Sequence, residues 1–236
     1  MNKNASLGSF FCTIENSTIV YMKDIINNTA DHVRKQLQNA EGGHDWFHIE
    51  RVWKNAKLIA AKEHCDIEVV QLAALLHDIA DSKFHGGNEE IGPTMAREFL
   101  ENAGLKPQKV EHIVAIVENV SFKGGHNTRS HSSIELDIVQ DADRLDAIGA
   151  IGIARTFNYG GYKNRAIYDP AIAPNLNMTK EEYKKSTAPT INHFYEKLLL
   201  LIDRMNTQTG KDIALERHRF METFLDQFYA EWDGLR

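Results

Sequence analysis

The sequence predicts an all-α protein, a helical bundle with additional helices toward its C-terminal end. Apolar residues recur with the spacing of a helix face in every segment to which a period can be assigned. No segment shows the sustained alternation of apolar and polar residues that is typical of a half-buried strand. With 236 residues, 42% of them hydrophobic, the chain can bury one sizeable core. We therefore expect residues 22–236 to form a single domain and residues 1–21 to be a loosely ordered extension.

The composition argues against a nucleic-acid polymer or a membrane as partner. The formal net charge is -6, so no overall basic field attracts polyanions or anionic lipid. No apolar segment reaches the length of a transmembrane helix. The two cysteines, Cys12 and Cys65, form no disulfide framework, which suits a reducing cytoplasm. The sequence leaves open whether the chain forms a homodimer.

The first two helices flank a glycine pair. One helix is predicted from about Lys23 to Ala40, and Gly42-Gly43 ends it. Asp45 is then placed as the N-cap of the next helix, whose apolar positions 49, 52, 53, 56, 59 and 60 trace one face. His48 stands beside this face, one turn before Val52. His44 is expected in the solvated loop, with a role at a pocket mouth left open.

The segment Gln71–Asp81 predicts a buried helix with an anomaly. It continues an apolar run from Ile67 to Ile79, yet it contains His77 and Asp78 side by side. A buried carboxylate costs several kcal/mol unless a partner neutralises it. Two interpretations remain at this point: a pair hydrogen-bonded to a nearby arginine, or two ligands of a divalent metal ion. On a continuous helix Asp81 would share the face of this pair.

Two further helices and two glycine-containing loops follow. The helices are predicted at Glu90–Ala103 and Lys109–Val120, and the loops at Ser82–Asn88 and Ser121–Ser133. His112 lies beside the apolar stripe of the second helix, and the sequence favours a core or surface histidine there over a metal ligand.

A second buried-type helix, Ile138–Ala154, carries unexplained carboxylates at Asp141, Asp143 and Asp146. Two such helices indicate one shared cation, to which His48 would add a nitrogen ligand. A loop is then predicted at Tyr159–Pro170, rich in aromatic and basic residues that could cover an active site or simply pack on the surface.

The last part of the chain predicts more helices. Thr179 and Glu182 have the spacing of a capping box. Pro189 is expected to interrupt this region before a longer helix that runs through Lys197–Ile202. The final helix is predicted at Lys211–Trp232, with these residues on its inner side: Ile213, Phe220, Phe224, Leu225 and Phe228.

The order of these motifs resembles the HD-domain metal-dependent phosphohydrolases. A histidine, then the His77-Asp78 pair, then Ala142-Asp-Arg-Leu145 match the family's ligand order, and the last block makes Asp143 the matching aspartate. The superfamily motif covers about residues 45–147. The sequence around this motif, such as His-Asp-Ile-x-Asp-x-Lys-Phe, is similar to that of a bacterial HD subfamily linked to nucleotide hydrolysis. This closer resemblance runs from about Met22 to the C-terminus.

This resemblance implies a reaction. The chain would cleave a nucleoside triphosphate or diphosphate to the monophosphate, with release of pyrophosphate or phosphate, by a water that the metal activates. It implies one divalent ion (Mn, Ni, Co, Fe, Zn or Mg) and a phosphorylated small molecule as partner. The alternatives are a nucleoside monophosphate or cyclic nucleotide as substrate, a di-iron oxygenase that uses His112, and a non-catalytic HD sensor.

The resemblance also implies roles for residues. The metal ligands would be His48, His77, Asp78 and Asp143, and Asp81 would be catalytic, by positioning the water or protonating the leaving oxygen. Asp81 departs from the family pattern, because other members carry Glu there, which reaches further. The candidates for binding phosphate are Arg51, Lys83, Lys123 and Arg144. Arg51 could instead be a structural ion-pair partner, and Arg144 could support the carboxylates of the metal site.

Overall fold

The computed structural model describes residues 22–38, 45–80, 90–120 and 131–236, and every regular element in these ranges is helical. This confirms the all-α prediction. Residues 22–36 are helical. The elements that follow are α2 (Trp46–Ala60), α3 (Ile67–Leu76), α4 (Ile91–Asn102), α5 (Pro107–Val120), α6 (Ile134–Asp146), α7 (Gly149–Tyr162), α8 (Lys180–Lys185), α9 (Asn192–Glu196), the 3₁₀ helix η2 (Leu198–Arg204) and α10 (Gln208–Trp232).

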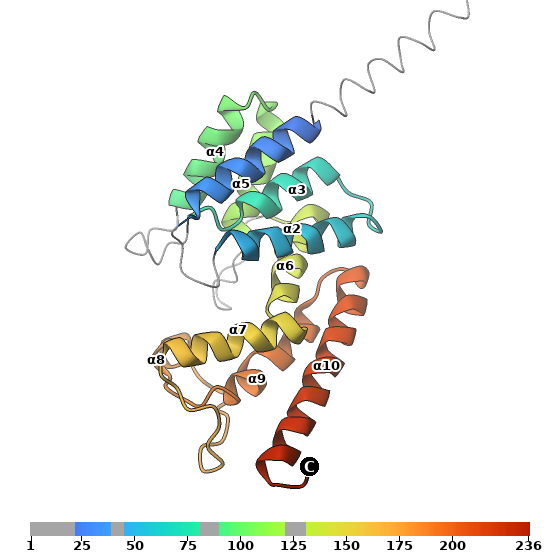
Figure 1. Ribbon diagram of the computed structural model, residues 1–236. Coiled ribbons are helices and arrows are strands. Elements are labelled where there is room, and N and C mark those ends of the chain that lie inside the picture. The colour runs from blue at the N-terminus through green and yellow to red at the C-terminus, as the bar shows by residue number, and fades with distance from the viewer. Residues whose placement is uncertain (1–21, 39–44, 81–89, 121–130) are drawn as a thin grey trace, which may run out of the picture.

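The helices form two groups that α6 joins (Figure 1). The first group contains the helix at residues 22–36 and α2–α5, and the second contains α7–α10. α6 contacts α2, α3 and α5 on one side and α7 and α10 on the other. The core of the first group centres on α3, where residues 72–76 are fully buried, as the sequence predicts for this apolar run. In the described ranges no helix combines the length and apolarity needed to cross a membrane.

Side-chain caps fix where several helices begin. The Asp45 carboxylate accepts the backbone N–H of His48 at 2.9 Å, and Ser133 caps α6 in the same way. Thr179 and Glu182 form a reciprocal capping box at the start of α8. The predicted N-cap and the predicted capping box are both confirmed. Because Asp45 fixes the first turn of α2, it also fixes the position of the His48 backbone, from which the imidazole extends.

The end of α3 differs from the prediction, because the helix stops at Leu76 rather than continuing to Asp81. The Nδ1 atom of His77 lies 2.8 Å from the carbonyl oxygen of Ala74, a carbonyl left without a helical partner at this end. The Ile79 N–H then bonds the Leu76 carbonyl in a tight turn. His77 and Asp78 therefore lie on a turn directly after the helix and not on its side.

The predicted helix Ile138–Ala154 is also wrong as one element, because it breaks between α6 and α7. Gly149 has φ +72°, in the left-handed region that favours glycine. α7 then continues to Tyr162, into the segment predicted as a loop. A Cβ atom on Gly152 would lie only 2.2 Å from the carbonyl oxygen of Ala147, so the chain can fold back at this corner only with glycine at position 152.

Replacing Gly152 with alanine is therefore expected to lower the free energy of unfolding by about 1–3 kcal/mol, because the backbone at Ala147 has to move. Gly161→Ala is the matched control on the same helix, since its Cβ would meet nothing within 4 Å. That variant should be neutral or slightly more stable, because alanine is the better helix former. Urea unfolding of the two variants checks this, and equal stabilities would contradict it.

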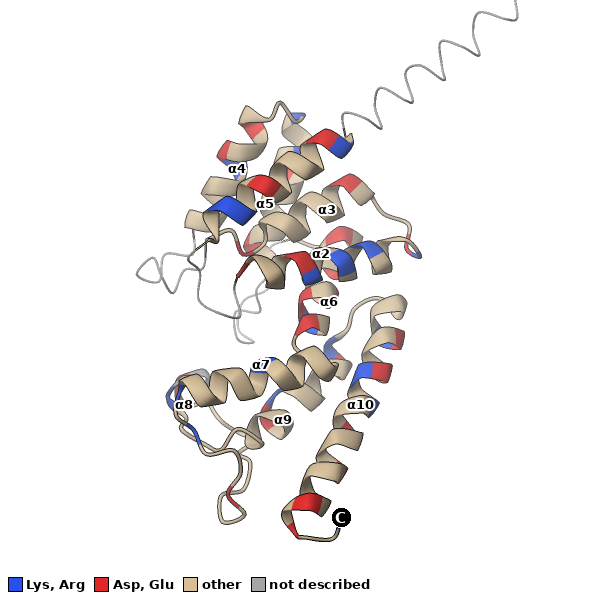
Figure 2. Cartoon of the chain, viewed as in Figure 1, with Lys and Arg blue, Asp and Glu red and all other residues tan. Residues whose placement is uncertain are grey.

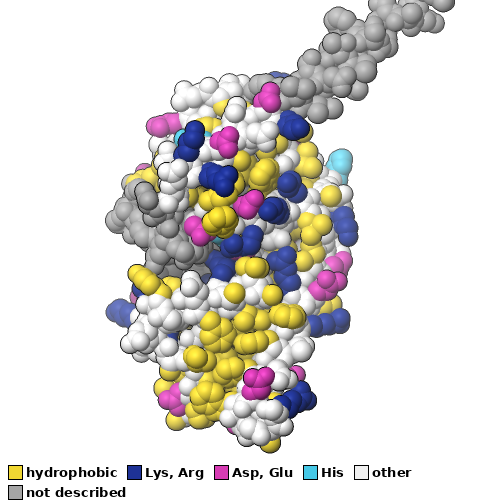
Figure 3. Space-filling view, viewed as in Figure 1, with side chains coloured by type: hydrophobic (Ala, Val, Ile, Leu, Met, Phe, Trp, Pro, Cys, Tyr) yellow, Lys and Arg dark blue, Asp and Glu magenta, His cyan; other side chains and the backbone are white. Residues whose placement is uncertain are grey.

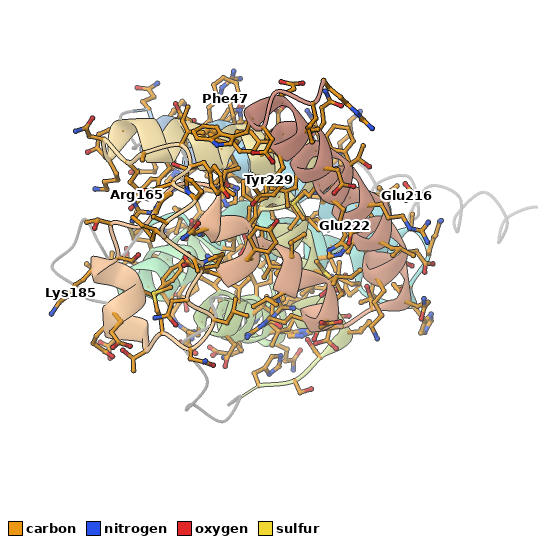
Figure 4. All side chains as sticks on the ribbon, turned by 90° about the horizontal axis from the view of Figure 1, so that it is seen from below. Phe47, Arg165, Lys185, Glu216, Glu222 and Tyr229 are labelled. Carbon is orange, nitrogen blue, oxygen red and sulfur yellow. The ribbon has the colours of Figure 1, made fainter. Side chains whose placement is uncertain are left out.

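The second group differs from the prediction in two places. The longer helix through Lys197–Ile202 is wrong: α9 ends at Glu196, Lys197 leaves helical geometry, and η2 follows as a 3₁₀ helix. Phe220, predicted on the inner side of α10, is 53% exposed. Figure 3 shows hydrophobic side chains gathered on the visible face of the lower part of the molecule, where the second group lies. Seen from below, the half-buried Tyr229 of α10 lies near the middle of the view, with its ring 5.3 Å from that of Tyr168, and Lys185 lies at the edge (Figure 4).

A histidine–tyrosine pair predicts how stability depends on pH. The Tyr183 hydroxyl lies 2.8 Å from Nδ1 of His193, and burial raises the pKa of Tyr183 to about 12, so the phenol stays protonated and donates. Burial, with the charges of Lys197 and Arg165, lowers the pKa of His193 to about 4 from its ordinary 6.5. Below pH 6.5 the unfolded chain therefore binds a proton here that the folded chain does not bind until about pH 4.

Because of this pair, the free energy of unfolding should fall by roughly 1–3 kcal/mol as the pH drops from 6.5 to 4. This range allows for solvent screening, which reduces the effect of a half-buried group. Thermal melts of the wild type and of His193→Asn across this range provide the test. The asparagine keeps an acceptor for Tyr183 but does not titrate, so the variant should lose less stability in acid. Parallel curves would contradict the assignment.

The N-terminal end of α10 is anchored to α2 and α6. Asp141 of α6 is fully buried and accepts the Thr207 N–H and hydroxyl, each at 2.8 Å. Thr209 donates its hydroxyl to Glu63 at 2.8 Å. Further along the helix, Arg217 donates to the carbonyl of Leu145 and, at 2.9 Å, to the side-chain oxygen of Asn55. These bonds fix the last helix against the elements that carry the predicted metal ligands.

Candidate metal centre

Four predicted ligands lie together where α2, α3 and α6 meet. Ligand atoms of His48, His77 and Asp78 all lie within 4.8 Å of one another. An Asp143 carboxylate oxygen lies 3.5 Å from Nε2 of His48 and 4.0 Å from Nε2 of His77. His48 comes from the first turn of α2, the His77-Asp78 pair from the turn after α3, and Asp143 from the second half of α6.

His77 has a buried nitrogen that fits a metal ion. Its Nδ1 is held at 2.8 Å from the Ala74 carbonyl, which accepts the ring proton, so the lone pair is on Nε2. Nε2 is buried and has no hydrogen-bond partner in the part of the chain that the structure describes. A buried polar atom without a partner costs about 1–3 kcal/mol. A cation among these side chains would satisfy it.

The distances between the ligand atoms suit a single ion. Atoms that share one ion at about 2.0–2.2 Å lie roughly 3–4.4 Å from one another. The 3.5 Å and 4.0 Å separations around Asp143 fall in this range. Two imidazole nitrogens and two carboxylate oxygens suit a transition metal or zinc. The Asp143 side chain is 39% exposed, whereas both histidines are buried, so the centre opens to solvent on the Asp143 side.

Asp146 lies directly behind His48. Its carboxylate is 1% exposed and stands 2.7 Å from Nδ1 of His48 and 2.6 Å from Nε of Arg51, and Arg155 also donates to it. Burial alone would raise the pKa of Asp146, but the bonds from His48 and Arg51 and the charge of Arg155 outweigh burial and hold its pKa well below its usual range. The carboxylate is therefore ionised.

The two described arginines that were predicted to bind phosphate both contact acidic side chains. Arg51 is 30% exposed and binds Asp146 with two nitrogens. Arg144 donates to the Arg204 carbonyl at 2.7 Å and to Asp141 and Gln140 at 3.3 Å. Arg51 thus has the contact of a structural ion-pair partner, the alternative that the sequence left open for it. The Arg144 contacts at 2.7 Å and 3.3 Å include Asp141 but no proposed metal ligand. Asp81, Lys83 and Lys123 lie outside the described residues, as do His44 and residues 1–21.

His112 lies at the opposite end of α6. Its Nε2 is 3.2 Å from the Ser133 hydroxyl and 3.6 Å from the Glu135 carboxylate. Glu135 precedes Asp143 by eight residues, which is about 12 Å along a helix. Among the described side chains the structure thus places His112 away from the metal ligands, beside the N-cap of α6.

Sequence reasoning missed Asp146 and Arg155. Asp146 drew attention only as one of three unexplained carboxylates, and Arg155 not at all. The available signal was weak: an aspartate three residues after the matched ligand on an apolar helix, followed by one arginine in an otherwise uncharged stretch. Neither position indicates by itself that Arg155 binds Asp146 or that Asp146 binds His48.

Comparisons with known proteins add a family match and close relatives. The HD domain model matches residues 46–148. Uncharacterized protein YpgQ of Bacillus subtilis is 35% identical over 204 residues, which is 86% of this chain and 91% of YpgQ. An HD-superfamily hydrolase from Bacillus thuringiensis has a crystal structure with TM-score 0.73 and 42% identity, covering 90% of this chain and 98% of its own. The crystal structure of YpgQ in complex with ADP gives TM-score 0.71 and 33% identity, with 89% and 96% covered.

Proposed function

Because this chain belongs to the HD-domain family, we propose that it is a metal-dependent phosphohydrolase that acts on nucleotides. The proposed reaction converts a nucleoside triphosphate or diphosphate to the monophosphate, with release of pyrophosphate or phosphate. The observation that carries the proposal is the meeting of His48, His77, Asp78 and Asp143 in a centre with two nitrogen and two oxygen ligands.

The centre supports hydrolysis for a chemical reason. A divalent cation bound by these four side chains would polarise a phosphoryl oxygen and lower the pKa of a water. His48 and His77 are buried, so their side chains are already held by packing and by hydrogen bonds from Nδ1. Asp143 lies at the solvent side, where a phosphorylated substrate would approach.

The remaining roles are assigned to basic and acidic side chains around the centre. Asp81 is proposed to position the attacking water or to protonate the leaving oxygen. Lys83 and Lys123 are proposed to neutralise phosphate charge. Of the two described arginines, Arg51 binds the Asp146 carboxylate behind the ligand His48 with two nitrogens, which favours a structural role over a phosphate contact. Arg144 is directed toward Asp141 and residue 204.

The substrate class draws support from a relative. YpgQ, which covers almost all of this chain, has been crystallised in complex with ADP. A bound nucleoside diphosphate in a protein of the same fold favours a nucleotide over other phosphate esters. The di-iron oxygenase alternative loses support, because it relied on His112, which contacts Ser133 and Glu135 at the N-terminal end of α6, and Glu135 precedes Asp143 by about 12 Å along that helix.

Product analysis on a nucleotide panel tests the proposal. Nucleoside triphosphates, diphosphates, monophosphates and cyclic nucleotides are supplied to the metal-free protein with Mn²⁺, Mg²⁺, Ni²⁺ or Co²⁺ added separately. We expect monophosphate plus pyrophosphate or phosphate from the first two classes. Turnover of the last two classes alone would move the substrate assignment to phosphate esters. Metal binding without turnover of any nucleotide would refute the proposal and favour a non-catalytic role.

A further inference from the structure

We propose that Asp146 is a positioning residue that fixes the ring tautomer of His48, so that the lone pair of Nε2 faces the metal centre. The inference rests on the metal centre of the proposed function but not on its substrate. Asp146 does not itself reach the cluster of ligand atoms, because His48 lies between the two. It therefore acts through His48.

The first step concerns what the Asp146 carboxylate can do. Its two oxygens face nitrogens of Arg51 and Arg155, which are donors only, so the carboxylate accepts hydrogen bonds and donates none. Its Oδ2 lies 2.7 Å from Nδ1 of His48, and both side chains are buried, so no water competes for the contact. His48 must then carry a proton on Nδ1. In the neutral ring, which is the form that binds a metal ion, the lone pair is on the opposite nitrogen, Nε2, which lies 3.5 Å from the Asp143 carboxylate.

The second step concerns why this carboxylate stays ionised and in place. Arg51 binds Oδ1 through Nε at 2.6 Å and Oδ2 through a terminal nitrogen at 3.0 Å, a bidentate contact that fixes the plane of the carboxylate. Arg155 adds a second guanidinium from α7. α7 is otherwise uncharged, as Figure 2 shows, and its one charged residue is directed at Asp146. α2, α6 and α7 thus converge on the group that orients His48.

The third step predicts what an amide would do at this position. The side chain that Asp146→Asn introduces has one oxygen and one NH₂ group, and Arg51 and Arg155 offer donors only. The amide oxygen would turn to the arginines and the NH₂ group to His48. His48 would then have to accept at Nδ1 and carry its proton on Nε2, which blocks the ligand nitrogen. This is a change of tautomer and not of charge.

The experiment compares the wild type with Asp146→Asn and Asp141→Asn. Asp141 is the matched control, since it is a fully buried and hydrogen-bonded carboxylate on the same helix whose partners are Arg144 and residues 206–207 and not His48. Nitrogen-15 NMR of the imidazoles in metal-free protein reports the tautomer, and calorimetry with Mn²⁺ reports the dissociation constant. Circular dichroism establishes that each variant is folded.

We expect the Nδ1–H tautomer of His48 in the wild type and in Asp141→Asn, and the Nε2–H tautomer in Asp146→Asn. The Mn²⁺ dissociation constant should rise about 10–100-fold in Asp146→Asn only. Excess Mn²⁺ should partly restore nucleotide turnover in that variant, which a lost fold would not allow. An unchanged dissociation constant in folded Asp146→Asn would overturn the proposal.

The tautomer of His48 in the wild type tests the proposal even if Asp146→Asn does not fold. An Nε2–H tautomer in the metal-free wild type would overturn the proposal directly. Arg155→Gln provides a second variant, in which the Asp146 carboxylate remains, so His48 should keep the Nδ1–H tautomer. An Nε2–H tautomer of His48 in Arg155→Gln would contradict the proposal. A wild type that shows the Nδ1–H tautomer and binds Mn²⁺, yet cleaves no nucleotide, would refute the proposed function and leave this inference standing.

Discussion

Replacing His77 with alanine is expected to abolish metal binding and to lower kcat/KM by at least about 10³-fold. The change removes the buried Nε2 that has no hydrogen-bond partner among the described residues. A catalytic metal ion contributes several kcal/mol of transition-state stabilisation, and each 1.4 kcal/mol or so is a factor of ten in rate. Asp78→Ala should behave in the same way, because its carboxylate belongs to the same cluster. Metal content and rate are measured on one sample of each variant.

His64→Ala is the matched control for His77→Ala. His64 is exposed in the turn between α2 and α3, so its loss removes an imidazole without affecting the cluster. This variant should keep stoichiometric metal and full activity. Stoichiometric metal in both His77→Ala and Asp78→Ala would show that the ion binds elsewhere. Metal loss in His64→Ala would show that the assay responds to damage of the fold and not to ligand removal.

Asp81→Asn is expected to leave metal content and fold intact while lowering kcat by about 10²–10⁴-fold. The residue follows Asp78 by three positions, and the four-ligand centre is complete without it. Its proposed work is proton transfer or the positioning of water, which the amide cannot perform. Because α3 ends at Leu76, this prediction no longer rests on a shared helix face; it rests on the family resemblance and on the closeness in sequence to the ligand turn.

Asp226→Asn, an exposed aspartate of α10, controls for the loss of one negative charge and should keep the wild-type kcat. Metal loss in Asp81→Asn would instead make Asp81 a ligand. An unchanged kcat would remove it from the mechanism. Metal analysis has to accompany the kinetics, because a lower rate alone does not separate a missing ion from a missing acid.

The presence of the helices was predictable, because apolar periodicity is a local property of the sequence. Their ends were predictable where a cap is local, as at Asp45 and Thr179. They were not predictable where the end depends on one side-chain contact or on a close approach. The His77 side chain ends α3 by binding the Ala74 carbonyl, and the corner after α6 depends on Gly149 and Gly152.

The candidate metal ligands could be picked out from their residue types and from the family resemblance, and the structure brings these four side chains together. The groups behind them were not, because their partners are distant in the chain. Arg51 and Asp146 are 95 residues apart, and neither sits in a local pattern that points to the other. The arginines therefore seemed equally available for phosphate, whereas the structure shows Arg51 and Arg144 bound to carboxylates.

The anchoring of α10 has a consequence for synthesis on the ribosome. Residues 46–148, which match the HD domain, are complete long before Gln208 begins α10. At about 5–20 residues per second, the 60 residues from 148 to 208 take roughly 3–12 seconds. During that interval Asp141 lacks the hydrogen bonds that Thr207 donates, and Asn55 lacks the hydrogen bond that Arg217 donates. We therefore expect the nascent HD segment to remain accessible to proteases and chaperones until α10 emerges and packs against α2 and α6.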